Sequence, residues 1–329
     1  MKKLVTAIVF IVILLVTLYF ISLFTQKIYV DETLLEIKPH SSAKSIANTL
    51  KKYGIIKNPK IFYYYVRLTE HDKKLKSGEY LFKGEMNLLE VIHVIEKGKV
   101  HLRRITFPEG FTYKKICRKL SKNGFGDYKT FMSLCEDSLF VKQLTTFSKP
   151  VIEGFLYPDT YFFPKGASEE FIIKKMVKTF YDKTKDIDFR PDFPINFYET
   201  LTLASIVEKE AKVASEKPLI AGVYLKRLKD RYKLQADPTV AYVLEKKGRT
   251  RKKIYYKDLE IDSPYNTYKC MGLPPTPISN PSEETIEAVL NYHDTDYLFF
   301  FANAGKHIFS KNYKTHILKQ NQIKYTRKR

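Results

Sequence analysis

The chain has 329 residues, of which 44% are hydrophobic and 14% are aromatic. This composition excludes a globally disordered protein, and the length suffices for a membrane anchor with one large domain or two modest ones. Lysine and arginine number 57 against 36 acidic residues, a formal net charge of +21, which favours anionic partners. Because the lysines are spread along the whole chain, most of them are interpreted as a solvated surface, and nothing beyond charge suggests nucleic-acid binding.

An uncharged apolar run occupies residues 4–24. At about 1.5 Å per residue it is long enough to cross a hydrocarbon core of about 30 Å. Lys2 and Lys3 precede it, so residues 1–3 are expected in the cytoplasm and the remainder outside. A cleaved signal peptide is the alternative, but the run is long and no A-x-A-like site follows it. We therefore expect a single-pass protein of the cell inner (cytoplasmic) membrane, with its bulk extracytoplasmic.

Residues 26–100 are predicted to form a small α+β module. Strands are expected at 33–38 and 78–82, and helices at 41–52, from Asn58-Pro59 onward, and at 87–97. Gly54 and Gly98 are the expected helix stops. Periodicity leaves open whether this module binds a ligand or acts as a spacer.

Residues 101–329 are predicted to form a larger mixed α+β domain. Helices are expected at 111–123, 128–136, 169–184 and 198–214, and a short one begins with Asp237 as N-cap and Pro238 in its first turn. A strand is expected at 101–107, and a hairpin joins 297–301 to 307–310. Residues 263–281 form a proline-rich loop. The aromatic stretch at 153–164, which includes Tyr157, suits either a sugar-binding surface or a packed wall.

The predicted helix at 198–214 contains the most informative carboxyl group. Glu208 has Lys212 four residues ahead, an arrangement typical of a surface ion pair. Glu210 instead has apolar neighbours three and four residues away on both sides, among them Val207 and Val213. A carboxyl on an apolar helix face is expected to have a raised pKa, as a general acid requires. The alternative is a structural carboxylate paired with a basic group from another segment.

Other kinds of site find little support in the sequence. No G-x-S-x-G, Walker or H-E-x-x-H motif occurs, the three cysteines have no metal or redox spacing, and no cofactor is predicted. Polar side chains suited to sugar hydroxyls and amides gather downstream of the helix, although each taken alone is more often a turn or cap residue. These candidates are Gln235, Asp237, Tyr265, Asn266, Thr267 and Tyr268.

Five segments together resemble the endolytic murein transglycosylase family, also called YceG-like. They are EGFLYPDTYFF at 153–163, ASIVEKEA at 204–211, LQADPTVAY at 234–242, SPYNTYKCMGLPPTPISNPS at 263–282, and YLFFFANAGKHIFSKNYKTH at 297–316. The resemblance implies that the second glutamate of the S-I-x-E-K-E run, Glu210, is catalytic. It also implies a LysM-like module within 26–100, a YceG-like catalytic domain at 101–329, and a partnership with peptidoglycan synthases such as penicillin-binding proteins.

The implied reaction cleaves the bond between N-acetylmuramic acid and N-acetylglucosamine within glycan strands. It leaves 1,6-anhydro ends, and it would terminate the elongation of nascent strands. Candidates for binding the sugar are Gln235, Asp237, Tyr265, Asn266, Tyr268 and Tyr157. The alternative is a non-enzymatic scaffold that binds the cell wall, for which Glu210 would be dispensable.

Overall fold

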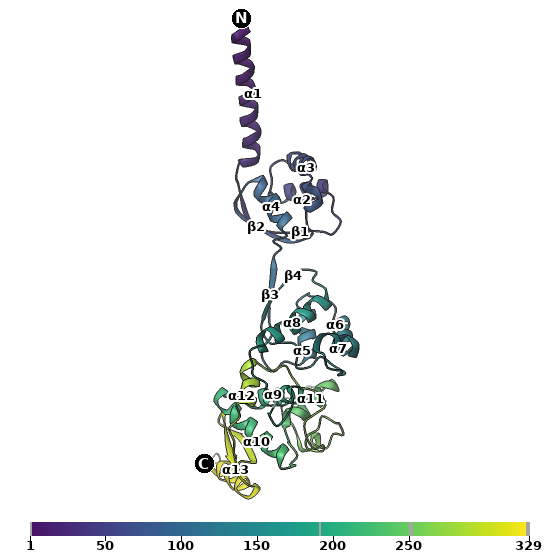
Figure 1. The fold of residues 1–329 in the computed structure, drawn as a ribbon, viewed down its shortest axis with the longest axis vertical. Coiled ribbons are helices and arrows are strands. Elements are labelled where there is room, and N and C mark those ends of the chain that lie inside the picture. The colour runs from purple at the N-terminus through teal and green to yellow at the C-terminus, as the bar shows by residue number, and fades with distance from the viewer. Residues whose placement is uncertain (1, 191, 250–252, 327–329) are drawn as a thin grey trace. The chain divides into compact units, whose positions relative to one another are not determined.

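The computed structural model describes residues 2–190, 192–249 and 253–326, and it has a mixed α+β fold (Figure 1). The chain divides into two compact units. The first unit is the chain up to Arg104 together with Phe162–Ala167, and the second is Ile105–Tyr161 with the chain from Ser168 onward. Within the described residues the strands form three two-stranded sheets, β1–β2, β3–β4 and β5–β6.

The N-terminal helix α1 spans Lys2–Thr25. Its segment Thr6–Thr25 has a mean hydropathy of 3.0 and is long and apolar enough to cross a membrane. A signal sequence near the N-terminus would meet the same criterion. The structure therefore bears out an apolar N-terminal helix.

The first unit pairs β1 (Ile28–Ile37) antiparallel with β2 (Gly78–Met86). Strand β1 begins earlier than the predicted 33–38, because a register shift between Val30 and Thr33 interrupts the alternation that marks a strand in the sequence. Helices α2 (Ala43–Lys52), α3 (Pro59–Leu68) and α4 (Leu88–Lys97) complete the unit, with a 3₁₀ turn at His71–Lys74.

Local capping explains where these three helices begin. The side chains of Ser42 and Asn58 accept backbone hydrogen bonds from the first turns of α2 and α3, and Asn87 forms a reciprocal capping box with Glu90 at α4. Gly98 ends α4 in the left-handed region, at φ 68°. The unit has its own apolar core, which includes Leu35, Leu50, Phe62, Val66, Tyr80, Phe82, Val91 and Ile95.

The second unit is mainly helical. Its helices are α5 (Tyr113–Lys122), α6 (Tyr128–Glu136), α7 (Ser138–Thr145), α8 (Glu169–Thr184), α9 (Phe197–Glu210), α10 (Lys217–Lys229), α11 (Asp237–Lys246), α12 (Glu283–Leu290) and α13 (Tyr313–Thr326). Short 3₁₀ turns occur at Ala214–Glu216 and Tyr256–Asp258. Strand β5 (Phe299–Asn303) forms the predicted hairpin with β6 (Lys306–Ser310). The strands β3 (Leu102–Thr106) and β4 (Thr160–Pro164) pair with each other, and each has residues in both units.

Helix α9 is the central element of this unit. Its residues from Thr200 to Val207 are all buried, and α10, α11 and α12 pack against it. The helix ends at Glu210, four residues before the predicted end at Ala214, because Ala211 is extended. The predicted N-cap of α11 is also wrong: Ala236 occupies that position, and Asp237 is the first helical residue with its side chain free for another partner.

Candidate active site

The last turn of α9 directs three consecutive side chains to three different places. Glu208 contacts the start of α12, Lys209 donates to the carbonyl of Gly110 at 3.2 Å, and Glu210 turns into a pocket. Such divergence follows from helix geometry, since successive residues are rotated by about 100°. One short motif therefore serves both to hold the fold and to form the site.

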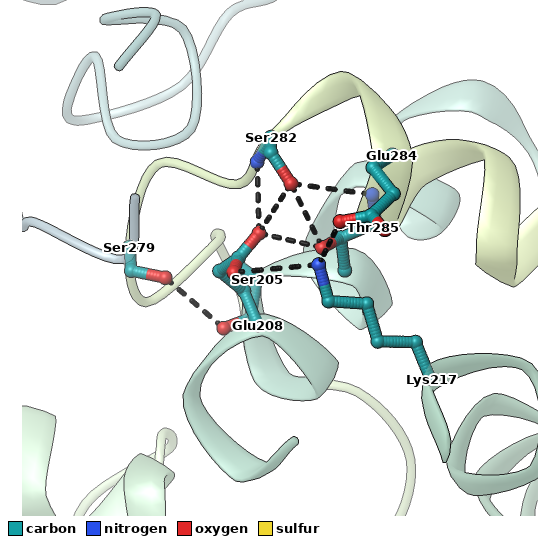
Figure 2. A network of polar contacts seen from close by, with 7 residues as sticks. All are labelled: Ser205, Glu208, Lys217, Ser279, Ser282, Glu284 and Thr285. Atoms are coloured by element: carbon teal, nitrogen blue, oxygen red, sulfur yellow. Dashed lines mark hydrogen bonds and ion pairs between the residues drawn. The ribbon is translucent and has the colours of Figure 1, made fainter. Parts of the chain in front are cut away.

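Glu208 is a structural anchor and does not form the predicted surface pair with Lys212. Its Oε2 accepts hydrogen bonds from the backbone and hydroxyl of Ser282, at 2.9 and 2.8 Å, and from the hydroxyl of Thr285 at 2.6 Å (Figure 2). Lys217 Nζ lies 3.9 Å from its other oxygen. The prediction fails because α9 ends before Lys212, so the two residues do not share a helix face.

Ser205 reinforces the same connection one turn earlier on α9. Its hydroxyl accepts from the backbone of Ile278 at 2.9 Å. Its carbonyl accepts from the hydroxyl of Ser279 at 3.0 Å (Figure 2). Both serines are fully buried, so these bonds replace hydration that folding removes. The end of the 263–282 loop is thereby fixed to the helix that carries Glu210.

Glu210 occupies an electrostatically unfavourable position for an ionised carboxyl group. Burial raises its pKa to about 7, and the nearby carboxylate of Asp237 acts in the same direction. The Tyr224 hydroxyl, which donates to its Oε1 at 3.0 Å, and the more distant Arg227 oppose this shift. Glu210 is also the last residue of α9, where the negative end of the helix dipole disfavours a second negative charge. Among the described residues, no basic side chain forms an ion pair with it.

Glu210 lines a pocket of about 340 Å³. Polar groups from three segments converge there with it: Tyr224 and Arg227 from α10, Gln235 and Asp237 from the start of α11, and Tyr268 from the long loop. The remaining wall is largely aromatic, and it is formed by Leu234, Phe300, Phe301, Ala302, His307, His316 and Gln320. Apolar surface combined with a few converging polar groups is typical of a binding site for a small molecule or a sugar.

The segment Leu234–Asp237 presents its polar side chains to the pocket by simple alternation. Leu234 and Ala236 are buried, whereas Gln235 and Asp237 are exposed. Gln235 adopts φ 48°, a left-handed conformation that is costly for a residue other than glycine. Asp237 Oδ1 accepts from the hydroxyl of Tyr268 at 2.6 Å, which joins the two segments across the pocket.

Arg227 connects two walls of the pocket, the segment before α11 and the start of the hairpin. Its guanidinium donates to the carbonyl of Leu234 at 2.6 Å and to that of Leu298 at 2.6 Å, and it lies 5.2 Å from the ring centre of Phe299. The side chain is 7% exposed. Arg227 therefore brings a positive charge to the pocket lining, while backbone carbonyl groups accept the hydrogen bonds of its guanidinium.

The hairpin wall is fixed through His307. Its Nδ1 lies 2.7 Å from Glu216, and its backbone donates to the same carboxylate at 3.0 Å. Because Glu216 follows α9 closely in the chain, this contact ties β6 to the segment after Glu210. The ring of Phe300 packs edge-on against both Tyr224 and His307.

Three of the predicted sugar-binding residues lie outside this pocket. Tyr265 is buried, and its hydroxyl lies 2.9 Å from that of Thr276. Asn266 is fully buried and donates to the carbonyls of Leu259 and Ile261, so it organises the long loop. Tyr157 is also buried, and its carbonyl accepts from Tyr161 at 2.8 Å. Gln235, Asp237 and Tyr268 are brought together with Glu210.

Sequence reasoning missed Tyr224, Arg227 and the aromatic side chains of the hairpin. A faint signal was present, since Tyr224 and Arg227 are three residues apart and therefore share a helix face. Nothing local, however, indicates that this face points at Glu210, because the contact joins residues 14 positions apart through tertiary packing.

Comparison with known proteins places this arrangement in a family. The YceG-like family model matches residues 35–322, which is most of the chain. The protein belongs to the YceG-like family. A Bacillus subtilis relative named endolytic murein transglycosylase is 35% identical over 300 residues, covering 86% of this chain and 82% of that protein.

Two further relatives agree with the assignment. A YceG-like protein from Listeria monocytogenes, known from a crystal structure, is 35% identical and aligns with a TM-score of 0.58 over 89% of this chain and 98% of that one. A Streptococcus pneumoniae protein, also named endolytic murein transglycosylase, is 30% identical over 84% of this chain, which spans 55% of that longer relative. In this YceG-like chain the family match includes both α9 and the pocket around Glu210.

Proposed function

We propose that this YceG-like protein is a lytic transglycosylase that cleaves peptidoglycan glycan strands internally, with Glu210 as its only acid and base. The observation that carries the proposal is a carboxyl group with its pKa raised to about 7, in a pocket of sugar-compatible polar and aromatic side chains. The names of the relatives, endolytic murein transglycosylase, support the same reaction and substrate.

The reaction uses the two protonation states of Glu210 in turn. The neutral carboxyl protonates the glycosidic oxygen, the bond from that oxygen to C1 of N-acetylmuramic acid breaks, and N-acetylglucosamine leaves with a free 4-hydroxyl. The carboxylate then accepts the proton of the muramic C6 hydroxyl while O6 bonds to C1. This step forms the 1,6-anhydro ring and returns Glu210 to its neutral form. The reaction therefore consumes no water and needs no second catalytic carboxyl group.

The surrounding groups have distinct roles in this scheme. Tyr224 orients the Glu210 carboxyl through their hydrogen bond. Asp237 and Arg227 place charges of opposite sign in the same pocket, and the carboxylate of Asp237 would favour the positive charge that develops on the sugar ring. Gln235 and Tyr268 supply groups that can bind hydroxyl and amide substituents of the sugar.

The decisive experiment compares wild-type protein with Glu210→Gln on purified peptidoglycan sacculi. Glutamine keeps the shape of the side chain and can still accept from Tyr224, but it cannot donate and recover a proton. We expect anhydro-muropeptides from the wild type and a loss of at least about 100-fold in the variant, the usual range for a general acid. Mass spectrometry identifies the products.

The outcomes separate the candidate functions. Reducing ends would indicate a hydrolase and would refute the anhydro-forming mechanism. Sacculus binding without any products would support the non-enzymatic scaffold. Undiminished anhydro products from Glu210→Gln would exclude Glu210 as the acid. Tyr265→Phe serves as a control, because Tyr265 lies outside the pocket.

We further propose that helix α1 anchors the protein once in the cytoplasmic membrane, with residues 1–3 inside and the following chain acting on the outer side; its length and apolar composition support this. Residues 26–100 are a LysM-like module and residues 101–329 carry catalysis. Cleavage close to the membrane would terminate the elongation of new strands beside peptidoglycan synthases. Co-purification of a synthase with the full chain tests that last point.

A further inference from the structure

Beside its core-facing residues, helix α3 of the first unit carries a second apolar stripe, in which Tyr65 packs partly against the core and other members are exposed. Helix α3 buries Phe62 and Val66 in the core, one turn apart. A second row, Ile61, Tyr64, Tyr65 and Leu68, follows the i, i+3, i+4, i+7 spacing on another face. In this row Tyr64 is 60% exposed and Leu68 is 83% exposed.

This stripe is continuous with the end of helix α1. The ring of Tyr65 lies 5.2 Å from that of Phe24, and Ile61 shares a cleft of about 280 Å³ with Leu23. Leu23 and Phe24 are the half-buried members of the last turn of α1, whereas the described side chains before them are exposed. The small unit therefore packs against the anchor helix at its exit end, through α4 and through the Tyr65 ring on α3.

The basic side chains near α3 and the tyrosines on it are both suited to contact with lipid headgroups. Residues 51–60 contain Lys51, Lys52, Lys57 and Lys60 and no acidic residue, whereas Arg67 further along α3 pairs with Asp72 at 2.8 Å. Basic side chains near a membrane surface attract anionic lipids, and tyrosine is enriched at the boundary between hydrocarbon and water. The cleft lined by Leu23, Ile55, Ile61 and Leu88 adds an apolar space beside the stripe, large enough for part of an acyl chain.

We infer that α3 lies in the headgroup region of the outer leaflet of the cytoplasmic membrane, with Tyr64 and Leu68 inserted and the neighbouring lysines bound to anionic lipid. The inference rests on the proposed anchoring by α1. An amphipathic helix bound in this way buries its apolar face by about 5–10 Å. The small unit is then held against the bilayer by two elements, and it cannot swing freely about the end of the anchor.

The chain contains no tryptophan, so a single introduced tryptophan gives an unambiguous fluorescence signal. We would reconstitute full-length Tyr64→Trp into vesicles of phosphatidylcholine and phosphatidylglycerol, with and without brominated phosphatidylcholine. Insertion to that depth is expected to reduce the emission roughly by half through bromine quenching. Leu68→Trp provides a second position should the first variant fold poorly. Leu34→Trp is the matched control, since Leu34 is 43% exposed on β1 of the same unit.

The results distinguish the inference from the anchoring on which it rests. Quenching of Tyr64→Trp well above that of Leu34→Trp supports insertion of α3. Equal emission with and without bromine, in protein that resists alkaline extraction from the vesicles, overturns the inference and leaves the anchor intact. Equal quenching of both variants also overturns it, because the unit would then have no preferred face. Release of the protein by alkaline extraction refutes the anchor itself.

Discussion

The surroundings of Glu210 favour its neutral form on balance. Burial, the nearby Asp237 and the end of α9 all oppose its ionisation, and only Tyr224 and Arg227 favour it. Residues that break local electrostatic rules in this way are concentrated at functional sites. The pH behaviour of the protein is therefore the most direct report on this side chain.

Tyr224→Phe is expected to shift the pH dependence of activity. The acid form of Glu210 is present below its pKa of about 7, so the rate should fall as pH rises through that value. The Tyr224 hydroxyl favours the carboxylate, so its removal should raise the pKa and move this descending limb upward by about one pH unit. The measurement is the rate of anhydro-muropeptide release against pH. A limb that stays in place would exclude the hydrogen bond as a determinant of this pKa.

Glu210→Gln is expected to stabilise the protein in alkaline solution. The pKa of Glu210 is higher in the folded state than in the unfolded state. The folded protein therefore loses stability as pH rises from the unfolded pKa through about 7. The amide avoids this cost, so the variant should gain of the order of 3 kcal/mol at pH 8 and almost nothing at pH 4. Thermal unfolding at both pH values measures the difference. Equal gains at both would point to a cause other than ionisation.

The apolar surroundings of Glu210 differ from those that the sequence predicts. Val213 and Ala214 were expected on its helix face, yet α9 ends at Glu210 itself. The apolar environment arises from tertiary packing around the pocket, and the helix end adds a further unfavourable term. Asp237 was similarly placed near the correct position with the wrong role, since its carboxylate accepts from Tyr268 and does not cap α11.

At the scale of elements, α9 and α12 are joined through one carboxylate. Glu208→Ala would leave the backbone and hydroxyl of Ser282 and the hydroxyl of Thr285 without their charged acceptor, while Lys217 would retain its ion pair with Glu284. We expect a loss of about 3 kcal/mol in unfolding free energy, because several buried donors lose a charged partner at once. Chemical denaturation of the full chain measures it. Glu287→Ala on the exposed face of α12 is the control and should change stability by less than about 0.5 kcal/mol.

Elements whose signals are local were predicted well, and those that depend on distant contacts were not. Helices α6 and α8 match the predicted 128–136 and 169–184 because their boundaries depend on capping residues and local periodicity. The hairpin turn was readable from Ala304-Gly305, which adopt φ 49° and 85°. The pocket was only half predicted, since Tyr224 and Arg227 reach it through the packing of α10.

At the scale of the whole molecule, the chain consists of two units with separate cores. The core of the first unit is formed by residues between Val30 and Ile95, with further apolar side chains from the same unit packed against it. The buried side chains around α9 and α8 belong to the second unit. A chain of this kind is expected to unfold in more than one step, so a single melting temperature would not describe it.

Phe82→Ala tests this independence. Phe82 is fully buried in the first core, and its truncation should cost about 3–5 kcal/mol there. For a unit of roughly 100 residues, this corresponds to a lowering of its melting temperature by about 15–25 °C. Scanning calorimetry of the full chain in detergent should show that transition moving while the other stays. Phe180→Ala, in the core of the second unit, should produce the reverse pattern. If either variant shifts one common transition, the two units unfold cooperatively and their separation is only geometric.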